Sequence, residues 1–449
     1  MMSISNNANS QVKNIFFHVN VSNNHGNIFS LRSTLKQSKI LLNNYKNIYN
    51  IAIHLDSGIY DIHDLMAFKD INANHKSTLS IIGKDKHQVR LKAGNIFFNN
   101  VKNIQFKNIT IEDCMGDGIG INNASNISFI GCQILNIGGW AFNIVNSKNI
   151  AIQSCDISGT RKGAIYVKSK EQSDNIFENN YIHDLHLNKV SFHPAIDLNG
   201  FGVTFKNNLF TNIPNQAIIC NNGGNIIEYN EFVNCSFNNG KGVVYSCNVN
   251  GSSGNIIKYN YLHDNKKSSC GGIFSNNCKN IDSVYGNIFK NVDNAVSLTN
   301  EVNVDLTNNV FINCNSVFIS RPSQLANKLD LNSVYDNNKS RLNSKIENNI
   351  CIGGFWDVNS YDLHSNVDSL FHIKMAVKNN LFDYTTRASS TANLNSHTIK
   401  IGYTNLDLIN PYYDNFNIET SNFPANFKYI QIPFQQIGIN IKQWSISMQ

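Results

Sequence analysis

The sequence predicts an all-β chain that folds as a right-handed, single-stranded parallel β-helix with an N-terminal helix cap. The first observation is a repeat. Asn followed by Ile or Val recurs at Asn103, Asn126, Asn149, Asn175, Asn225, Asn255, Asn280 and Asn303. The first three positions are 23 residues apart, and the later intervals keep a similar length with small insertions. Such a period, made of short alternating segments, is typical of a solenoid whose repeats bury their inner faces by stacking.

The second observation is the pattern inside one repeat. Three short alternating stretches, Trp140–Ile144, Asn149–Ile152 and Cys155–Ile157, are separated by turns of Asn, Ser and Gly. Each stretch is predicted to be one strand of a triangular coil. Because parallel strands stack about 4.8 Å apart, equal positions of successive coils form ladders. The repeated Asn is therefore predicted to lie at a turn, where its amide bonds along the stack and its backbone tolerates left-handed angles.

The chain divides into three predicted regions. Residues 1–95 form a β-α-β capping region, in which a helix starts with Ser30 as its N-cap and presents Leu31, Leu35, Ser38 and Leu42 on one face. Residues 96–385 form the coils, with a polar insertion near 322–345. Residues 386–449 form a C-terminal tail that folds back as a cap. A helix over the open end of the stack would protect its unpaired edge.

Composition and charge limit the classes of partner that we expect for this chain. The chain has 449 residues, is 41% hydrophobic and only 15% charged, and its net charge of +6 is scattered. No stripe of Lys and Arg with interleaved aromatics indicates a nucleic-acid partner. The N-terminus shows neither a signal peptide nor a membrane-spanning stretch, so localisation is left open and no membrane insertion is expected.

Ten cysteines lack the spacing of a metal site, and we expect neither a metal nor a cofactor. Cys132 and Cys155 are 23 residues apart, which is one coil. Both are predicted to stack inside the coils as small apolar side chains, with a disulfide framework as the weaker alternative.

The outward residues of the first strand of each coil form a predicted ribbon. Alternation places these pairs on it: Asn143 and Val145, Tyr166 and Lys168, Asp197 and Asn199, Ile219 and Asn221, Tyr245 and Cys247, Phe274 and Asn276, and Ser297 and Thr299. Aromatic rings beside amides suit the apolar faces and the hydroxyls of sugar rings. The alternative is a sheet surface that only contacts solvent.

Three segments resemble a known family: His193–Gly200, Ile213–Ile218 and Glu228–Glu231. They are similar to β-helix glycoside hydrolases of the α-L-fucosidase and xylanase type, which have a pectin lyase-like fold. The resemblance implies a polysaccharide or glycan partner. Where similar members carry catalytic acids or a histidine, this chain has Gly240, Asn276, Asn277 and Asn215. Since these residues do not exchange protons near neutral pH, we expect hydrolysis to be weak or lost.

The ribbon and the resemblance together give the candidate site. Asp197 and His193 are the candidate catalytic residues, and Lys168 or Lys241 could neutralise the carboxylate of a uronic acid. The candidate substrate-binding residues are Tyr166, Lys168, Asn199, Asn221, Lys241, Tyr245, Phe274 and Asn276. We favour a glycan-binding β-helix. An active hydrolase or lyase with a rearranged site around Asp197 and His193 is the first alternative, and a structural or adhesive rod is the second.

Overall fold

The computed structural model describes most of the chain, in two compact units. The described residues are 2–6, 12–19, 21–22, 25–26, 28–44, 47–62, 66–69, 71, 76–185, 192–236, 242–247, 253–265, 271–276, 282–299, 304–321, 343–356, 374–378, 380–382, 387–388, 398–400, 408–410, 415–418 and 427–439. Unit 1 comprises residues 1–210 with 439–449, and unit 2 comprises residues 211–438. The boundary falls inside β22 (Leu209–Ile213). Each unit is described by itself.

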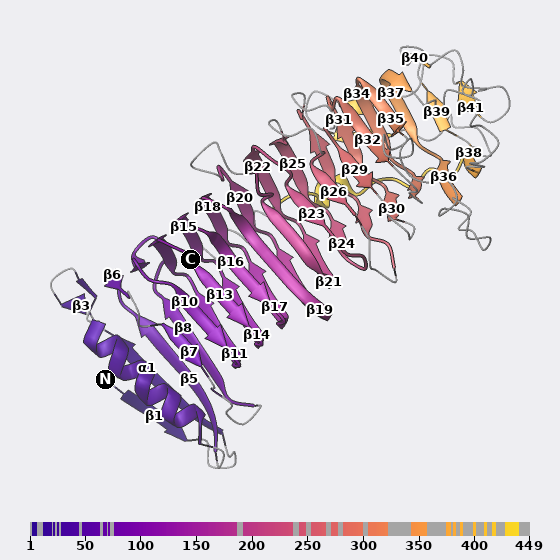
Figure 1. The fold of residues 1–449 in the computed structure, drawn as a ribbon. Coiled ribbons are helices and arrows are strands. Elements are labelled where there is room, and N and C mark those ends of the chain that lie inside the picture. Colours follow the sequence, from indigo (N-terminus) through magenta and orange to yellow (C-terminus); the bar gives the residue numbers. More distant parts are fainter. Residues whose placement is uncertain are drawn as a thin grey trace, which may run out of the picture. The chain divides into compact units, whose positions relative to one another are not determined.

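Unit 1 is a stack of parallel coils, each with three strands (Figure 1). The first strands are β7 (Ala67–Lys69), β10 (Ile96–Asn99), β13 (Ile119–Asn122), β16 (Trp140–Val145) and the starts of β19 (Gly163–Glu178) and β21 (Ile196–Lys206). The second strands are β2 (Val12–Val19), β5 (Ile48–Leu55), β8 (Thr78–Gly83), β11 (Lys102–Lys107), β14 (Ser125–Ile130), β17 (Lys148–Gln153) and the ends of β19 and β21. The third strands are β4 (His25–Gly26), β6 (Gly58–Asp61), β9 (Val89–Lys92), β12 (Thr110–Cys114), β15 (Gln133–Ile137), β18 (Asp156–Thr160) and β20 (Tyr181–His183). The predicted right-handed parallel β-helix is confirmed.

The N-terminal helix α1 (Ile28–Leu42) packs against β2 and β5. Its predicted apolar face is confirmed, because Leu31, Leu35, Ser38 and Leu42 are all buried. Its start is two residues earlier than predicted, so Ser30 lies inside the helix and is not its N-cap. On the same helix, Lys39 Nζ donates to the Ala67 carbonyl at 2.6 Å, and burial lowers the pKa of this lysine.

Parallel coil strands are already present before residue 96, where the sequence predicts that the coils start. β2 pairs in parallel with β5, and β5 pairs in parallel with β8. Two antiparallel pairings precede them, of β1 (Met2–Asn6) with β2 and of β3 (Val21–Ser22) with β4. The N-terminal region therefore contributes coils of its own in addition to the helix.

Unit 2 repeats the three-stranded coil. Its first strands are β23 (Ile218–Cys220), β26 (Val244–Ser246), β29 (Ile273–Asn276), β32 (Asn294–Thr299) and β35 (Ser316–Arg321). Its second strands are β24 (Ile226–Glu228), β27 (Ile256–Lys258), β30 (Asp282–Tyr285), β33 (Val304–Thr307), β36 (Asn343–Glu347) and β38 (Lys374–Lys378). Its third strands are β25 (Glu231–Cys235), β28 (Tyr261–His263), β31 (Ile288–Lys290), β34 (Val310–Cys314), β37 (Ile350–Trp356), β39 (Asn380–Phe382) and β41 (Thr398–Lys400).

The remaining elements of unit 2 are β40 (Arg387–Ala388), which pairs with β37, the antiparallel pair β42 (Leu408–Asn410) and β43 (Asn415–Ile418), and the short 3-10 helix η3 (Phe434–Gln436). The expected insertion near 322–345 lies outside the described residues except for its last three positions, which belong to β36.

The described C-terminal segment of unit 2, residues 427–438, lies along the side of its coils. Ile430 exchanges two hydrogen bonds with the side chain of Asn308, and the Gly438 N–H donates to the Tyr229 carbonyl. The ring of Phe434 packs edge-on against Tyr261 at 5.3 Å between centroids. In its described part, the expected C-terminal cap thus covers a flank of the coils.

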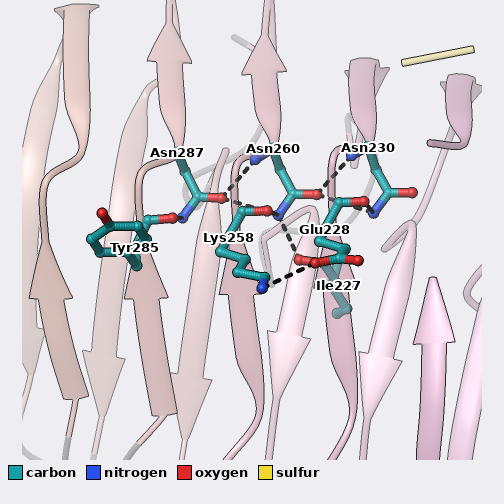
Figure 2. Close-up of polar contacts among 7 residues, drawn as sticks. All are labelled: Ile227, Glu228, Asn230, Lys258, Asn260, Tyr285 and Asn287. Atoms are coloured by element: carbon teal, nitrogen blue, oxygen red, sulfur yellow. Dashed lines mark hydrogen bonds and ion pairs between the residues drawn. The ribbon is translucent and has the colours of Figure 1, made fainter. Parts of the chain in front are cut away.

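A ladder of buried asparagines runs through unit 2 where each second strand turns into the third (Figure 2). The Asn260 side-chain oxygen accepts from both the backbone N–H and the Nδ2 of Asn230, at 2.9 and 3.0 Å. Asn287 accepts the same two bonds from Asn260, at 2.9 and 3.0 Å. The pattern continues through Asn309, Asn349 and Asn380. Each coil therefore satisfies backbone donors that would otherwise be buried without an acceptor.

The predicted turn ladder at the Asn-Ile repeat is confirmed for its first three members, Asn103, Asn126 and Asn149. Its later members Asn175, Asn225 and Asn255 are fully buried instead and have no positive φ. Asn126 Nδ2 donates to Asn103 Oδ1 at 2.8 Å, and Asn149 Nδ2 donates to Asn126 Oδ1 at 3.2 Å. All three have φ between 55° and 59°, the left-handed region that Asn tolerates well. Cys132 and Cys155 are fully buried as predicted, and every cysteine that the structure describes is free.

Candidate active site

The core of the candidate site is one row of outward side chains on the first strands of unit 1. Strand register places Asn143 of β16 beside Tyr166 of β19, and Tyr166 beside Asp197 of β21. A parallel row two residues further on contains Val145, Lys168 and Asn199 in the same strands. The structure thus brings together five sequence-predicted site residues: Tyr166, Lys168, His193, Asp197 and Asn199.

Trp140 contacts two rings of this site. Its ring centroid lies 5.6 Å from that of Tyr166 and 5.6 Å from that of His193. The indole is 5% exposed, so it positions its neighbours and offers little surface of its own. Gly163 makes room for it, because a Cβ atom there would lie 2.4 Å from the indole ring. We infer that Trp140 restricts the orientation of the Tyr166 and His193 rings.

Asp117 ties Trp140 to the row. One of its carboxylate oxygens accepts from the Trp140 backbone N–H at 2.8 Å, and the other accepts from Asn143 Nδ2 at 2.7 Å. The sequence reasoning missed both Asp117 and Trp140 as parts of the site. The signal was present, since the two residues are 23 positions apart and so occupy the same place in successive coils.

A second ring continues the row at its other end. Phe97 of β10 aligns with Gly120 of β13, which aligns with Asn143. Its side chain is 37% exposed and lies across Gly120, where a Cβ atom would come within 2.9 Å of the ring. Phe97 and Tyr166 are three coil rises apart, or about 14 Å. The polar pair Asp117 and Asn143 lies between these two rings along the stack.

Burial dominates the electrostatics around Asp197. It raises the pKa of this carboxyl group above 3.8, although a hydrogen bond from Asn199 and the nearby His193 act in the opposite direction. Asn199 Nδ2 donates to Asp197 Oδ1 at 2.9 Å. Burial also raises the pKa of Tyr166, and the charge of Asp197 adds to this effect. A carboxyl group with a raised pKa next to a histidine and a tyrosine is a common feature of sites that transfer protons.

The spacing of the two carboxylates argues against hydrolysis by this pair. A two-carboxylate glycosidase needs its acids about 5 to 9.5 Å apart. Asp117 precedes the β13 coil and Asp197 lies three coils later, which corresponds to about 14 Å along the stack. Asp117 therefore serves as a structural acceptor for Trp140 and Asn143.

The other predicted residues belong to unit 2. Tyr245 and Phe274 stack at 5.4 Å with an interplanar angle of 12°. Ile219, Tyr245 and Phe274 follow one another in register. Asn221 is half-buried, and Asn276 ends β29. Lys241 lies outside the described residues.

Two further residues of unit 2 belong to the expected site. Ser297 aligns with Phe274, as predicted for the outward row, but it is only 4% exposed and is therefore covered in the folded chain. Asn215, the residue at the expected histidine position, is 2% exposed and therefore buried.

The described residues contain neither a cluster of metal-ligating side chains nor a helix that could span a membrane. Within the described ranges, no three His, Cys, Asp or Glu side chains are grouped so that they could hold a metal ion. The part of the chain that the structure describes also contains no helix with the length and hydropathy needed to cross a membrane.

Comparisons with known proteins agree with the fold. The family model described as "right handed beta helix region" matches residues 71–237. A search of curated protein sequences finds no match to this chain.

Solved structures similar to this chain include three lyases. A PL6 family polysaccharide lyase from Pseudopedobacter saltans is 14% identical with a TM-score of 0.58, over 91% of this chain and 97% of its own. A mannuronic acid specific family 6 lyase from human gut microbiota is 13% identical with a TM-score of 0.58, over 87% and 91%. The PL6 family alginate lyase AlyGC is 14% identical with a TM-score of 0.64, over 95% of this chain and 58% of its own. At these identities the likeness shows the fold.

Proposed function

We propose that this protein binds a polysaccharide along the outward row of unit 1 that contains Phe97, Asn143, Tyr166 and Asp197. The observation that carries the proposal is the arrangement of that row. Two aromatic rings about 14 Å apart along the stack flank a hydrogen-bonded Asp–Asn pair, and a carboxyl group follows the second ring. Aromatic faces pack on the apolar faces of sugar rings, while amides and carboxylates bind hydroxyls.

Tyr166 is proposed as the central platform because neighbouring residues restrict the orientation of its ring. The Trp140 ring packs against it, Gly163 leaves space for the indole, and Asp117 accepts a hydrogen bond from the Trp140 backbone N–H. A ring held in one orientation loses little conformational entropy when a ligand packs on it. The similar solved structures include lyases that act on polysaccharides such as alginate, which agrees with a glycan ligand.

Weak or absent hydrolysis is part of the proposal. The positions that the resemblance would make catalytic hold Asn215 and Asn276 in this chain, and Asp117 is too far from Asp197 to act as its partner. The second candidate function is a lyase, favoured by the contact between His193 and Trp140 beside the half-buried Asp197. In that case His193 takes the proton from the carbon that carries the uronate carboxylate, and Lys168 stabilises the resulting negative charge. The glycosidic oxygen on the neighbouring carbon then leaves and takes up a proton from solvent as the carbon–carbon double bond forms.

One experiment separates these functions. The purified chain is screened on a glycan array, and each bound polysaccharide is then incubated with the protein. The samples are assayed both for new reducing ends and for the ultraviolet absorbance of unsaturated uronates. Binding without either product supports the glycan-binding function. Unsaturated products support the lyase, and reducing ends without them show a hydrolase whose catalysts lie elsewhere. A chain that binds no glycan on the array contradicts the proposal.

A further inference from the structure

Unit 1 contains a cavity of about 430 Å³ that lies apart from the rings of the candidate site. It forms where the first strand of each coil turns into the second. Its lining comes from the turns at Asn123–Ser125 and Asn146–Lys148, from the irregular stretch Ser169–Gln172 of β19, and from Lys102. Val145 and Lys168, which directly precede two of these segments, belong to the second outward row of the site. The lining therefore begins one residue beyond this row along the chain.

Small residues create the hollow. Ala124, Ser125, Ser147 and Ser169 are all buried and form its floor. The hydroxyl of Ser147 accepts from the Ala124 N–H at 3.0 Å and donates to the Val145 carbonyl at 2.8 Å. These bonds hold the turns in place without filling the space above them.

Positive charge surrounds the hollow. Lys102, Lys148 and Lys170 line it together with a single acidic residue, Glu171. Register aligns Ser125 with both Lys102 and Lys148, so these lysines are two coil rises apart, or about 10 Å. All three lysines are exposed, and among the described residues no carboxylate forms an ion pair with any of them.

We propose that this cavity binds an anionic group, a carboxylate or a sulfate ester, carried by the polysaccharide that lies on the row at Tyr166. The inference rests on the proposed function and specifies its ligand as an acidic glycan. Lysine ammonium groups form charge-assisted hydrogen bonds with such oxygens, and three of them around one hollow raise the local concentration of anions. The spacing of Lys102 and Lys148 also lets separate sugar units of one chain be held at once.

The test compares two variants with the same change in net charge. The cavity variant carries Lys102→Gln, Lys148→Gln and Lys170→Gln. The control variant carries Lys13→Gln, Lys36→Gln and Lys107→Gln, three exposed lysines of the same unit outside the cavity. Binding is measured by calorimetry with polygalacturonate, its methyl ester, dextran sulfate and dextran. The first pair isolates the carboxylate and the second isolates the sulfate ester.

The wild type is expected to bind at least one acidic polymer more tightly than its neutral counterpart. The cavity variant should lose about tenfold or more of that affinity, with a weaker dependence on salt, while the control variant keeps it. Whichever acidic polymer shows this loss identifies the group. Equal losses in both variants, or no loss in the cavity variant, overturn the inference.

The same titrations separate this inference from the proposed function. Binding of a polymer that weakens with Tyr166→Ala but does not respond to the lysines refutes the anionic cavity alone. Failure of the wild type to bind any of the four polymers, or any glycan on the array, refutes both.

Discussion

Asn260 Oδ1 accepts two hydrogen bonds from Asn230, one from its backbone N–H and one from its side-chain amide (Figure 2). Both residues are fully buried. The Asn260 amide itself donates to Asn287 Oδ1 and to the Ile227 carbonyl at 2.8 Å. One side chain therefore connects three coils of unit 2.

Removing this amide should destabilise the protein. Asn260→Ala removes the acceptor of the buried Asn230 backbone N–H and one acceptor of its side-chain amide, and we expect the free energy of unfolding to fall by about 3 kcal/mol. Denaturant unfolding measures the change. Asn50→Ala is the control, because its exposed amide donates to Asn14 across two neighbouring strands. A loss in Asn260→Ala no larger than in the control would contradict the role assigned to the ladder.

The stability of unit 1 should depend on the charge of His183. Burial lowers the pKa of this histidine, but hydrogen bonds to Asp156 at 2.9 Å and Asp184 at 2.8 Å outweigh burial and raise it above 6.5. A raised pKa in the folded state means that the stabilisation is fully present below about pH 6.5 and is lost as the pH rises through the folded pKa. The loss of stability in His183→Gln should thus be larger at acidic than at alkaline pH.

This dependence is measured by urea unfolding of wild type and variant at several pH values. His87→Gln, which removes an exposed histidine from the turn before β9, is the control. A destabilisation by His183→Gln that stays constant with pH would show that the two aspartates do not stabilise the protonated ring.

Asp197→Asn should leave the fold intact. Since burial raises the pKa of Asp197, its ionised form reduces the stability of the folded state at neutral pH. The variant should be at least as stable as the wild type near pH 7, and this difference should shrink as the pH falls through the raised pKa of the wild-type carboxyl group. If the chain is a lyase or a hydrolase, the same variant should lose turnover. A clear loss of stability at pH 7 would mean that the carboxylate is needed for folding.

Tyr245 provides a test of unit 2. Its ring stacks on Phe274, which makes the pair a candidate platform of its own. Tyr245→Ala should weaken binding of a long polysaccharide by about 1–2 kcal/mol, whereas Tyr245→Phe, which keeps the ring, should retain most of the affinity. Calorimetry gives both values. Equal affinity of the alanine variant and the wild type would restrict the site to unit 1.

The fold was predictable because its signals are local and repeated. The positions of Asn103, Asn126 and Asn149 gave the coil length, and alternation then placed Tyr166 and Asp197 on the same outward row, as the structure shows. The helical face of Leu31, Leu35 and Leu42 followed from its spacing in the same way.

Contacts made by turns were not predictable from alternation. Asp117 precedes its strand, and its role depends on a side chain reaching the next coil. Ser297 has the alternation of an outward residue, yet it is covered in the folded chain. The buried ladder at Asn230, Asn260 and Asn287 cannot be told apart in the sequence from the surface ladder, because both have the same residue type and nearly the same period.

The central claim is tested most directly by the affinity of Tyr166→Ala for a polysaccharide that the wild type binds, measured by calorimetry. Tyr181→Ala is the matched control, since Tyr181 is a half-buried tyrosine of the same unit that stacks on His183 in a third strand. We predict a loss of about 1–2 kcal/mol in binding free energy for Tyr166→Ala and none for Tyr181→Ala. Unchanged affinity in Tyr166→Ala, with wild-type stability, would contradict the proposal that the glycan lies on this row.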